Sequence, residues 1–440
     1  TRAGGGKDEV RAVGATVPKA DRAGCSYTIV PQFNATNYER SQTALRIMAA
    51  DTALTSRGLI SRLVGLAVAA SSLRVRMPPA DLTPPGMPTL DPYQSAAVRG
   101  CLQSVLALIQ GPPGTGKTAT VAAHVFHLVR QGAGSVLVCA PSNAAATRIA
   151  EYLRGLGLQV LRHFSKAREV EAAAVHAELR LAHHAAGVDS DNARTVGKLI
   201  ELKAEFGAAA DSDERLLGEL QEAVNDEAMR RADVVVCTTM TAGSTEIARH
   251  VFKLVVIDEA AQATEADTVV PLILGAERLV LVGDHRQLGP VVKHMPSLRA
   301  GMGVSLFERL AGGSVPQFLL ATQYRMHPEL SVYAGQAFYD GRLRDGVTAE
   351  QRASHVQWPV ASYPGYFHDV PANDRFVGTS RANDAEATVV VATVGWLLGQ
   401  RVPASDIGII ATYGAQVGVI RRALDRARTG SVVVNTVDSY

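Results

Sequence analysis

Short apolar runs rich in β-branched residues alternate with helix-forming stretches along most of this chain. The strand-length runs lie at residues 105–109, 136–140, 234–238, 254–257 and 279–282. Such alternation is typical of a parallel sheet covered by helices, because each parallel strand needs a long crossover connection. A second alternating block begins near Gln317 and contains strand-like runs at 407–411 and 432–434 around a helical pattern at about 416–428. The pattern therefore predicts an α/β protein with two parallel-sheet domains.

Three stretches depart from this alternation. Residues 166–231 contain no strand pattern but are rich in Ala, Leu, Glu and Arg, which predicts a helical insertion. Residues 25–31 have the composition of one short strand, and a Pro-rich segment at 78–92 separates this N-terminal region from the first sheet domain. The chain stops at Tyr440, directly after a predicted strand, so we expect the second domain to be truncated.

Composition places the chain among ordinary globular proteins. Its 440 residues are 47% hydrophobic and 20% charged, and the net charge is only +2, so any nucleic-acid contact must come from a local groove. The four cysteines are widely spaced with no arrangement suited to zinc, which favours reduced thiols in an intracellular protein. No apolar stretch fits a signal core or a membrane span, which excludes secreted and membrane classes.

A phosphate-loop pattern lies between the first predicted strand and a helical segment. Its residues are Gly111, Pro112, Pro113, Gly114, Thr115, Gly116, Lys117 and Thr118. Glycines let backbone amides turn toward the β-phosphate of a nucleotide, and the helix N-terminus adds partial positive charge. Lys117 is predicted to bridge the β- and γ-phosphates, and Thr118 to offer an oxygen to Mg²⁺. The alternative is a glycine-rich turn without a ligand, which the flanking strand and helix disfavour.

Three further segments supply residues suited to hydrolysis of a bound nucleotide. Asp258 and Glu259 follow an apolar strand, where the first can hold Mg²⁺ and the second can orient and deprotonate water. The amide of Gln287, in a glycine-rich loop, can donate to the γ-phosphate and lose that partner after hydrolysis. Arg325 can neutralise charge on the transferred phosphoryl group. Purely structural roles, as a helix-capping pair or a buried ion pair, are the alternatives for the carboxylates and the arginine.

Six segments, read in order, resemble the motif series of superfamily 1 helicases. They are residues 90–94 (LDPYQ), 111–118 (GPPGTGKT), 140–143 (APSN), 258–265 (DEAAQATE), 283–290 (GDHRQLGP) and 323–328 (QYRMHP). Within that superfamily, residues 283–292, 305–310 and 258–265 look most like the up-frameshift RNA helicases of nonsense-mediated mRNA decay. The resemblance extends from about residue 27 to residue 440.

The resemblance implies an order of domains. In up-frameshift helicases a small β-barrel and stalk helices precede the first of two RecA-like domains, and a helical subdomain interrupts that domain. We therefore expect a partial β-barrel remnant at 1–35, a stalk and linker at 36–85, a first RecA-like domain at 86–321 with the insertion at 166–231, and a truncated second RecA-like domain at 322–440.

The resemblance also implies roles for individual residues. Gln94 is expected to read the edge of adenine and Tyr324 to stack on its ring. Gln287 and Arg325 are expected to contact the γ-phosphate, which makes ATP and Mg²⁺ the expected cofactors. Contacts to RNA, mainly to phosphate and 2′-hydroxyl groups, are expected from Pro141, Ser142, Asn143, Thr238, Thr239, Tyr413, Gly414 and Gln416. The alternative for each of these is an ordinary polar loop position.

The activity that the resemblance implies is ATP-driven movement on single-stranded RNA. We expect a cytoplasmic monomer with RNA-stimulated ATPase activity, which moves 5′ to 3′ and remodels ribonucleoprotein in nonsense-mediated decay. Other decay factors are expected to bind through regions absent here, and no membrane is expected as a partner. Two interpretations stay open beside it: a nucleotide-gated RNA clamp, and a related DNA/RNA helicase of the immunoglobulin-mu-binding or senataxin type.

The sequence departs from the up-frameshift pattern at two places. Ala260 and Ala261 stand where the family commonly has Ser and Thr, which removes two hydroxyls near the predicted Mg²⁺ site but keeps both carboxylates. Residues 434–440 match only the first part of the fifth motif, and the sixth, which normally supplies a second arginine for the γ-phosphate, is absent. We therefore expect this chain to bind ATP and RNA but to hydrolyse ATP slowly.

Overall fold

The computed structural model describes most of the chain. The described residues are 35–50, 55–66, 77–132, 134–165, 195, 211–360, 363–429 and 431–437. Apart from residue 35, the β-barrel remnant predicted at 1–35 lies outside them, and so does most of the insertion predicted at 166–231. The domain boundaries proposed from the sequence therefore stay predictions.

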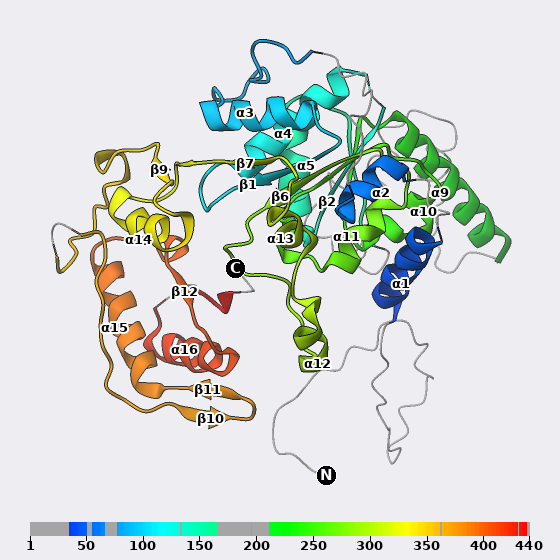
Figure 1. Ribbon diagram of the computed structural model, residues 1–440. Helices are drawn as coiled ribbons and strands as arrows, with labels where there is room; N and C mark the ends of the chain where they lie inside the picture. The colour runs from blue at the N-terminus through cyan, green and yellow to red at the C-terminus, as the bar shows by residue number, and fades with distance from the viewer. Residues whose placement is uncertain are drawn as a thin grey trace, which may run out of the picture.

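The central feature is one parallel sheet of seven strands, in the order β3-β4-β2-β5-β6-β1-β7 (Figure 1). The strands are β1 (Leu106–Gln110), β2 (Val136–Ala140), β3 (Val160–Arg162), β4 (Val234–Thr238), β5 (Leu254–Ile257), β6 (Arg278–Gly283) and β7 (Gln317–Leu319). Five of them were predicted as apolar runs, to within one residue at each end. The α/β class predicted from the alternation is confirmed.

Both faces of this sheet are buried, which explains why its strands are apolar without alternation. Along β1, Leu106 and Leu108 join one hydrophobic cluster, while Ala107 and Ile109 join the cluster on the opposite face. Every residue of β1, β2 and β5 is buried. Burial on both faces fixes the register, because a slip of one residue would exchange the two sets of side chains.

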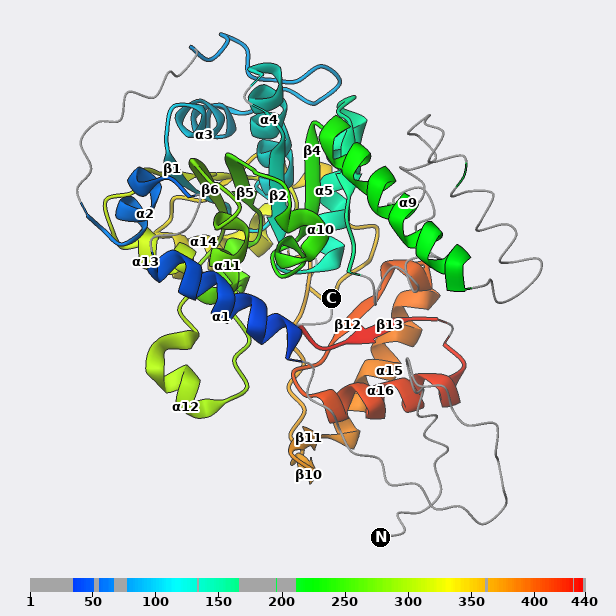
Figure 2. The same cartoon turned by 90° about the vertical axis from the view of Figure 1, so that its right-hand side faces the viewer.

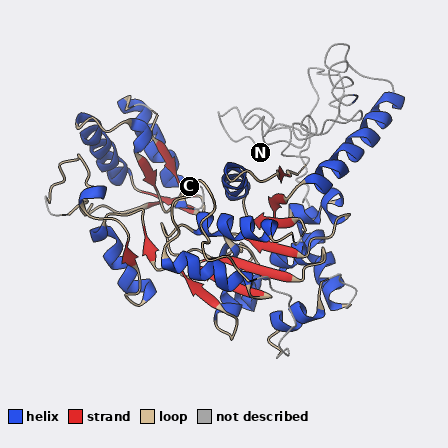
Figure 3. Ribbon diagram, turned by 90° about the horizontal axis from the view of Figure 1, so that it is seen from above, coloured by secondary structure: helices blue, strands red, loops and turns tan. Residues whose placement is uncertain are grey.

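Helices cover the sheet on both sides (Figure 3). One face packs against α3 (Pro92–Leu102), α4 (Lys117–Arg130) and α5 (Asn143–Gly155). The other packs against α1 (Thr36–Ala49), α2 (Arg57–Leu63), α10 (Thr245–Ala248), α11 (Glu265–Leu272) and α13 (Leu306–Ala311). α1 lies against α11, where the Ser41 hydroxyl donates to Asp267 at 3.0 Å (Figure 2). The described end of the predicted insertion is the long helix α9 (Asp211–Arg231), which leads into β4.

A second region lies beside the free edge of the sheet at β7. Its helices are α14 (Pro328–Tyr339), α15 (Asp384–Gly399) and α16 (Gly414–Ala427), and its strands form the pairs β8 (Thr322–Gln323) with β9 (Arg344–Asp345), β10 (Arg375–Val377) with β11 (Ser380–Ala382), and β12 (Gly408–Ile410) with β13 (Val433–Asn435). The β12–β13 pair is parallel and shares a third hydrophobic cluster with α15 and α16. The helix and both strands predicted here are therefore present, in a sheet of two strands among the described residues.

Between the two regions, residues 286–304 form a projecting segment that contains the short helix α12 (Met295–Ser297). Three cysteines, Cys101, Cys139 and Cys237, are free and buried. None of the described helices combines the length and the hydrophobicity needed to cross a lipid bilayer.

Candidate nucleotide and RNA site

Most of the predicted site residues of the large sheet lie along the edge formed by the carboxyl ends of its strands, because parallel strands all end on the same side. β1, β5 and β6 lead into the phosphate loop, the Asp258–Glu259 pair and the loop that holds Gln287. β2 and β4 lead into the predicted RNA residues at 141–143 and 238–239. Since β5, β6 and β1 are neighbours, as are β3, β4 and β2, one half of this edge carries the nucleotide residues and the other half carries the RNA residues.

The phosphate loop has the backbone that its glycines allow. Gly114 and Gly116 adopt φ of +77° and +79°, in the left-handed region that favours glycine. A Cβ atom at Gly111 would lie 2.1 Å from Cγ of Lys117, so the lysine stem fills the space that a side chain would need. Lys117 begins α4, and its Nζ donates to the carbonyl of Gly111 at 2.9 Å. The lysine is thus folded back over the loop whose phosphate it is predicted to hold.

The remaining loop residues brace this turn. Thr115 is buried and its hydroxyl donates to the carbonyl of Pro112 at 2.8 Å. Pro113 and Thr118 are half-buried, and Thr118 lies in the first turn of α4. An oxygen at Thr118 is therefore available beside the lysine, as a Mg²⁺ site requires.

The two carboxylates after β5 lie close to this lysine. Asp258 is buried, with 4% of its surface exposed, while Glu259 adopts a left-handed φ of 51° and has its Oε1 3.6 Å from Nζ of Lys117. Burial, and then the neighbouring Glu259, raise the pKa of Asp258 to about 6. A carboxylate so destabilised in its ionised form gains more than an exposed one from a bound cation, which fits the donor set of a Mg²⁺ site.

The loop after β6 is organised by Asp284, a residue that the sequence analysis did not single out. Its buried carboxylate accepts from Nε2 of Gln287 at 2.7 Å and from Nε2 of Gln110, in β1, at 3.2 Å. It also accepts from the hydroxyl of Tyr339, at the end of α14, at 2.6 Å. The predicted sensor Gln287 therefore shares one oxygen with a residue of the second region. Asp284 could have been found from its position directly after a strand, whereas no local pattern indicated Tyr339.

The segment that carries Tyr324 and Arg325 lies directly against the phosphate loop. The amide of Tyr324 donates to the carbonyl of Gly114 at 2.8 Å, and a Cβ at Gly114 would lie 2.5 Å from Cβ of Arg325. The Tyr324 hydroxyl donates to Oδ2 of Asp91, before α3, at 2.8 Å. Two separately predicted motifs, residues 111–118 and residues 323–328, are thus brought together at the nucleotide loop.

Gln94 joins α3 to the phosphate loop. Its Oε1 accepts from the amide of Asp91 at 3.1 Å and closes a capping box, and its Nε2 donates to the carbonyl of Thr115 at 3.1 Å. Both ends of the amide are therefore used within the protein. The role predicted for Gln94, reading of adenine, stays a prediction and requires one of these bonds to be exchanged.

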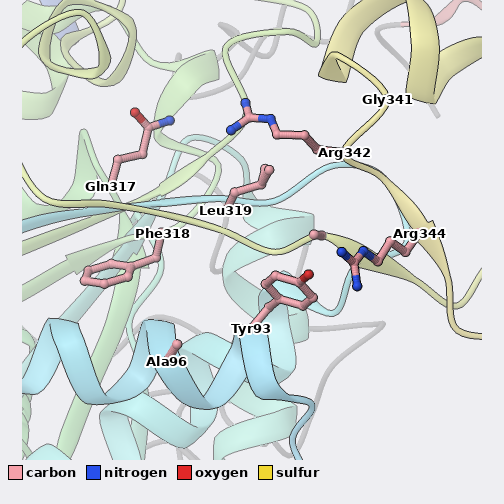
Figure 4. Close-up of a pocket in the computed structure, with 9 residues that line it drawn as sticks. Tyr93, Ala96, Gln317, Phe318, Leu319, Gly341, Arg342 and Arg344 are labelled. Carbon is pink, nitrogen blue, oxygen red and sulfur yellow. The ribbon is translucent and has the colours of Figure 1, made fainter.

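A pocket of about 540 Å³ adjoins this corner of the molecule (Figure 4). It lies between α3, the free edge of β7 and the segment after α14, and its lining residues are Tyr93, Ala96, Gln317, Phe318, Leu319, Ala321, Gly341, Arg342 and Arg344. The guanidinium of Arg344 lies 5.8 Å from the centroid of the Tyr93 ring. None of these residues was predicted from the sequence, because they meet only when the two regions pack together.

The predicted RNA residues after β2 lie at the start of α5. Ser142 caps this helix, with its hydroxyl accepting from the amide of Ala145 at 3.2 Å. Asn143 is half-buried, and its Oδ1 accepts from Nη2 of Arg162 at 2.9 Å. Pro141 is also half-buried. These residues leave part of their surface open to a ligand.

The predicted RNA residues after β4 lie next to them, because Ala140 and Thr238 are partners in the β2–β4 pair. The hydroxyl of Thr238 lies 2.7 Å from that of Thr241 and is half-buried. Thr239 is only 2% exposed, and its amide donates to the carbonyl of Ala140 at 3.1 Å. In this arrangement Thr239 serves the joint between the two loops, and its RNA role stays a prediction.

The predicted RNA residues of the second region lie at the start of α16. Tyr413 and Gly414 are exposed. Gln416 is 6% exposed, because its carboxamide exchanges two hydrogen bonds with the backbone of Asn383, at 2.8 Å and 3.0 Å. Gln416 therefore ties α16 to the start of α15, and an RNA contact from it stays a prediction.

Comparison with known proteins adds a family to this geometry. Two family models, each described as an AAA domain, match residues 302–440 and residues 89–214 and 159–295. A regulator of nonsense transcripts 1 homolog from Arabidopsis thaliana is 38% identical over 421 residues, which is 93% of this chain and 33% of that protein. The ATP-dependent helicase upf1 of Schizosaccharomyces pombe is 38% identical over 400 residues, 87% of this chain and 42% of that protein.

The chain spans roughly a third to two fifths of the length of these relatives. Among solved structures, the PRRSV helicase matches 61% of this chain and 40% of that chain, at 18% identity and a TM-score of 0.30, which is too low to carry an argument. The motif order, the two AAA-domain matches and the identity along nearly the whole chain agree with one another. The chain belongs to the same family as these regulators of nonsense transcripts 1.

Proposed function

We propose that this chain is the motor of an ATP-driven RNA helicase, which couples ATP hydrolysis to movement along single-stranded RNA. The observation that carries the proposal is the convergence of Lys117, which follows β1, with Asp258 and Glu259, which follow β5. Only β6 separates these two strands, and Arg325 lies against the phosphate loop. A lysine on a phosphate loop, paired carboxylates and an arginine from a second region are the groups that phosphoryl transfer to water requires.

The proposed chemistry assigns one task to each side chain. Lys117 releases the carbonyl of Gly111 and binds the β- and γ-phosphates of ATP. Glu259 orients the attacking water and accepts its proton, while Arg325 and Gln287 stabilise the charge on the γ-phosphoryl group. Asp258 and Thr118 would hold Mg²⁺, which when bound neutralises phosphate charge. Gln94 and Tyr324 hold the base.

The proposed RNA track runs over the ends of β2 and β4 and reaches α16 in the second region. Its exposed or half-buried residues are Pro141, Ser142, Asn143, Thr238, Tyr413 and Gly414. Their small polar groups and backbone amides suit phosphate and 2′-hydroxyl groups, so the proposed binding does not depend on base sequence. The relatives' names support nonsense-mediated decay as the proposed setting. A cytoplasmic monomer that moves 5′ to 3′ is proposed from the motif resemblance alone.

The experiment that tests this function is steady-state ATP hydrolysis by the chain with and without single-stranded RNA, beside a strand-displacement assay. We expect turnover that rises when RNA is added and disappears in Glu259→Gln. ATP turnover that does not change when RNA is added would contradict the helicase proposal and would favour a nucleotide hydrolase that does not act on RNA. RNA-stimulated turnover without strand displacement would favour a nucleotide-gated RNA clamp.

A further inference from the structure

Arg162, the last residue of β3, is a buried charge without a carboxylate partner. Its side chain has no exposed surface, and it forms no ion pair with an acidic residue among those that the structure describes. Burial lowers its pKa to about 10, so the guanidinium is still charged at neutral pH. Removing a guanidinium from water costs several kcal/mol unless hydrogen bonds replace the water, so the contacts of this side chain indicate what the charge is for.

Those contacts join the end of β3 to the middle of β4 and to the start of α5. Nη2 donates to Oδ1 of Asn143, the first residue of α5, at 2.9 Å. Nη1 donates to the carbonyl of Val236, in β4, at 3.3 Å, and to the carbonyl of His163 at 2.5 Å. The guanidinium also lies 4.0 Å from the centroid of the Phe164 ring. A single side chain therefore links the loop after β2 to the strand that ends at Thr238.

The contact with Asn143 fixes which way its amide points. An arginine has only donors, so the atom of Asn143 that faces Nη2 must be the carbonyl oxygen. The amide nitrogen Nδ2 is then directed away from the guanidinium. It has no hydrogen-bond partner among the described residues, and Asn143 is only half-buried, so its two N–H donors remain for a ligand.

We propose that Arg162 is a positioning residue for RNA: it holds Asn143 so that Nδ2 donates to the RNA backbone, and it holds the loops after β2 and β4 in register. The inference rests on the proposed function, because it deepens the RNA-binding half of that function. Arg162 touches no RNA itself, since it has no exposed surface. Its effect on RNA must therefore pass through Asn143 and the neighbouring strand end.

The test is a double-mutant cycle with Asn143→Ala, Arg162→Met and both together. RNA affinity is measured by fluorescence anisotropy with a labelled single-stranded oligonucleotide, nucleotide affinity with a fluorescent ATP analogue, and stability by thermal unfolding. We expect each single variant to weaken RNA binding by about 10-fold, the effect of one hydrogen bond to a charged acceptor. The double variant should bind RNA no more than about twofold more weakly than either single variant, because both substitutions remove the same contact.

Nucleotide affinity should stay unchanged in all three variants, which a general loss of structure would not allow. Arg130→Met is the control. It removes an exposed arginine at the end of α4 that lies away from the phosphate loop. Because Arg162→Met leaves a buried site without its cation, the cycle is repeated with Arg162→Lys. Lysine keeps the charge but cannot bridge Asn143 and Val236 as a planar fork does, so the same coupling with Asn143→Ala is expected.

Three results would overturn the inference. If the effects of Arg162 and Asn143 simply add, Arg162 acts through some other route. If Asn143→Ala leaves RNA affinity unchanged in a protein that binds RNA, the contact does not exist, while the proposed function survives. If the unaltered chain binds no RNA at all, the proposed function fails first and the inference fails with it.

Discussion

The two halves of the large sheet use charge in different ways. In the half built on β5, β6 and β1, the lysine and carboxylates lie within reach of one another and of the space above the phosphate loop, with Lys117 and Glu259 3.6 Å apart. In the half built on β3, β4 and β2, the predicted RNA residues are neutral, and the charge of Arg162 is wholly buried. Charge is presented in one half and used as internal support in the other.

This difference follows from what each half is proposed to do. Breaking a phosphoanhydride bond develops charge on particular atoms, and only ionised groups close to those atoms lower the barrier by several kcal/mol. Holding a backbone that must also be released at every step needs many weak donors of fixed direction. Changes in the first half should therefore alter turnover by orders of magnitude, and changes in the second half should alter RNA affinity by small factors.

The largest effect is expected from Glu259→Gln. The substitution keeps the shape of the side chain but removes the base, so kcat should fall by roughly 100- to 10,000-fold. RNA affinity should stay within about twofold, because Glu259 belongs to the nucleotide half. Steady-state ATPase assays and RNA titrations check both expectations. The control is Glu277→Gln, which changes an exposed carboxylate paired with Lys253. An equal loss of turnover in that control would show that the effect is not specific to Glu259.

The next largest effect is expected from Lys117→Ala. It removes a charged donor to the nucleotide phosphates, which is worth about 1.5–3 kcal/mol, or roughly a 10- to 100-fold loss of nucleotide affinity. Titration with a fluorescent ATP analogue measures the loss. Glu259 also loses its cationic neighbour, but no hydrogen bond or ion pair joins Lys117 to the predicted RNA residues in the described part of the chain. A parallel loss of RNA affinity in the absence of nucleotide would therefore break the separation between the halves.

A smaller effect is expected from pH, through Asp258. Its pKa is raised to about 6, so below that pH the carboxyl group is protonated and a poor Mg²⁺ ligand. The Mg²⁺ dependence of nucleotide binding should therefore weaken by up to about tenfold per pH unit as pH falls below about 6. Asp258→Asn should lose this pH dependence. Mg²⁺ titrations between pH 5 and pH 8 give the answer, and a flat profile in the unaltered protein would contradict the assignment.

The same shift has the opposite sign for stability. The folded-state pKa of Asp258 lies above the usual value of 3.8, so the folded state holds its proton more tightly than the unfolded chain does. The associated stability is present below the unfolded pKa and is lost as pH rises through about 6. Without Mg²⁺, Asp258→Asn should therefore unfold at a higher urea concentration than the unaltered protein at pH 7, and this gap should close at low pH.

Sequence alone predicted the features that depend on short stretches of neighbouring residues. The strands of the large sheet are continuous apolar runs, because burial on both faces leaves no polar positions in them. The phosphate loop, Asp258 and Glu259 could be predicted since each follows directly from a strand end. The seven-strand order could not, because no local pattern says that β5, β6 and β1 are neighbours.

What sequence could not supply were the contacts between distant segments. Asp284, Tyr339 and Arg162 act through partners 55, 55 and 19 residues away, respectively. The same is true of Gln416, whose composition suggests an open polar loop but whose carboxamide is taken by Asn383, 33 residues earlier. A polar side chain looks the same in a sequence whether it faces a ligand or completes the protein's own hydrogen bonds.

The smallest effect is expected from Thr238→Val, which sharpens the comparison from the RNA half. The two side chains have nearly the same shape, and only the hydroxyl is lost. RNA affinity should fall by roughly 2- to 10-fold, corresponding to a hydrogen bond worth about 0.5–1.5 kcal/mol. Because no charge is removed, the dependence of log affinity on log salt should keep its slope, whereas loss of a lysine or arginine that contacts phosphate would lower it.

The matched control for this prediction is Thr393→Val, which removes a hydroxyl that donates to the carbonyl of Val389 within α15. RNA titrations at several salt concentrations measure affinity and slope together, and ATPase assays at saturating RNA measure kcat. We expect kcat to be unchanged in Thr238→Val, since the hydroxyl lies in the half of the sheet that holds none of the predicted ATP residues. A fall in kcat at saturating RNA would show instead that the loop after β4 acts on the carboxylates of β5 across β2, and that the two halves are one mechanical unit.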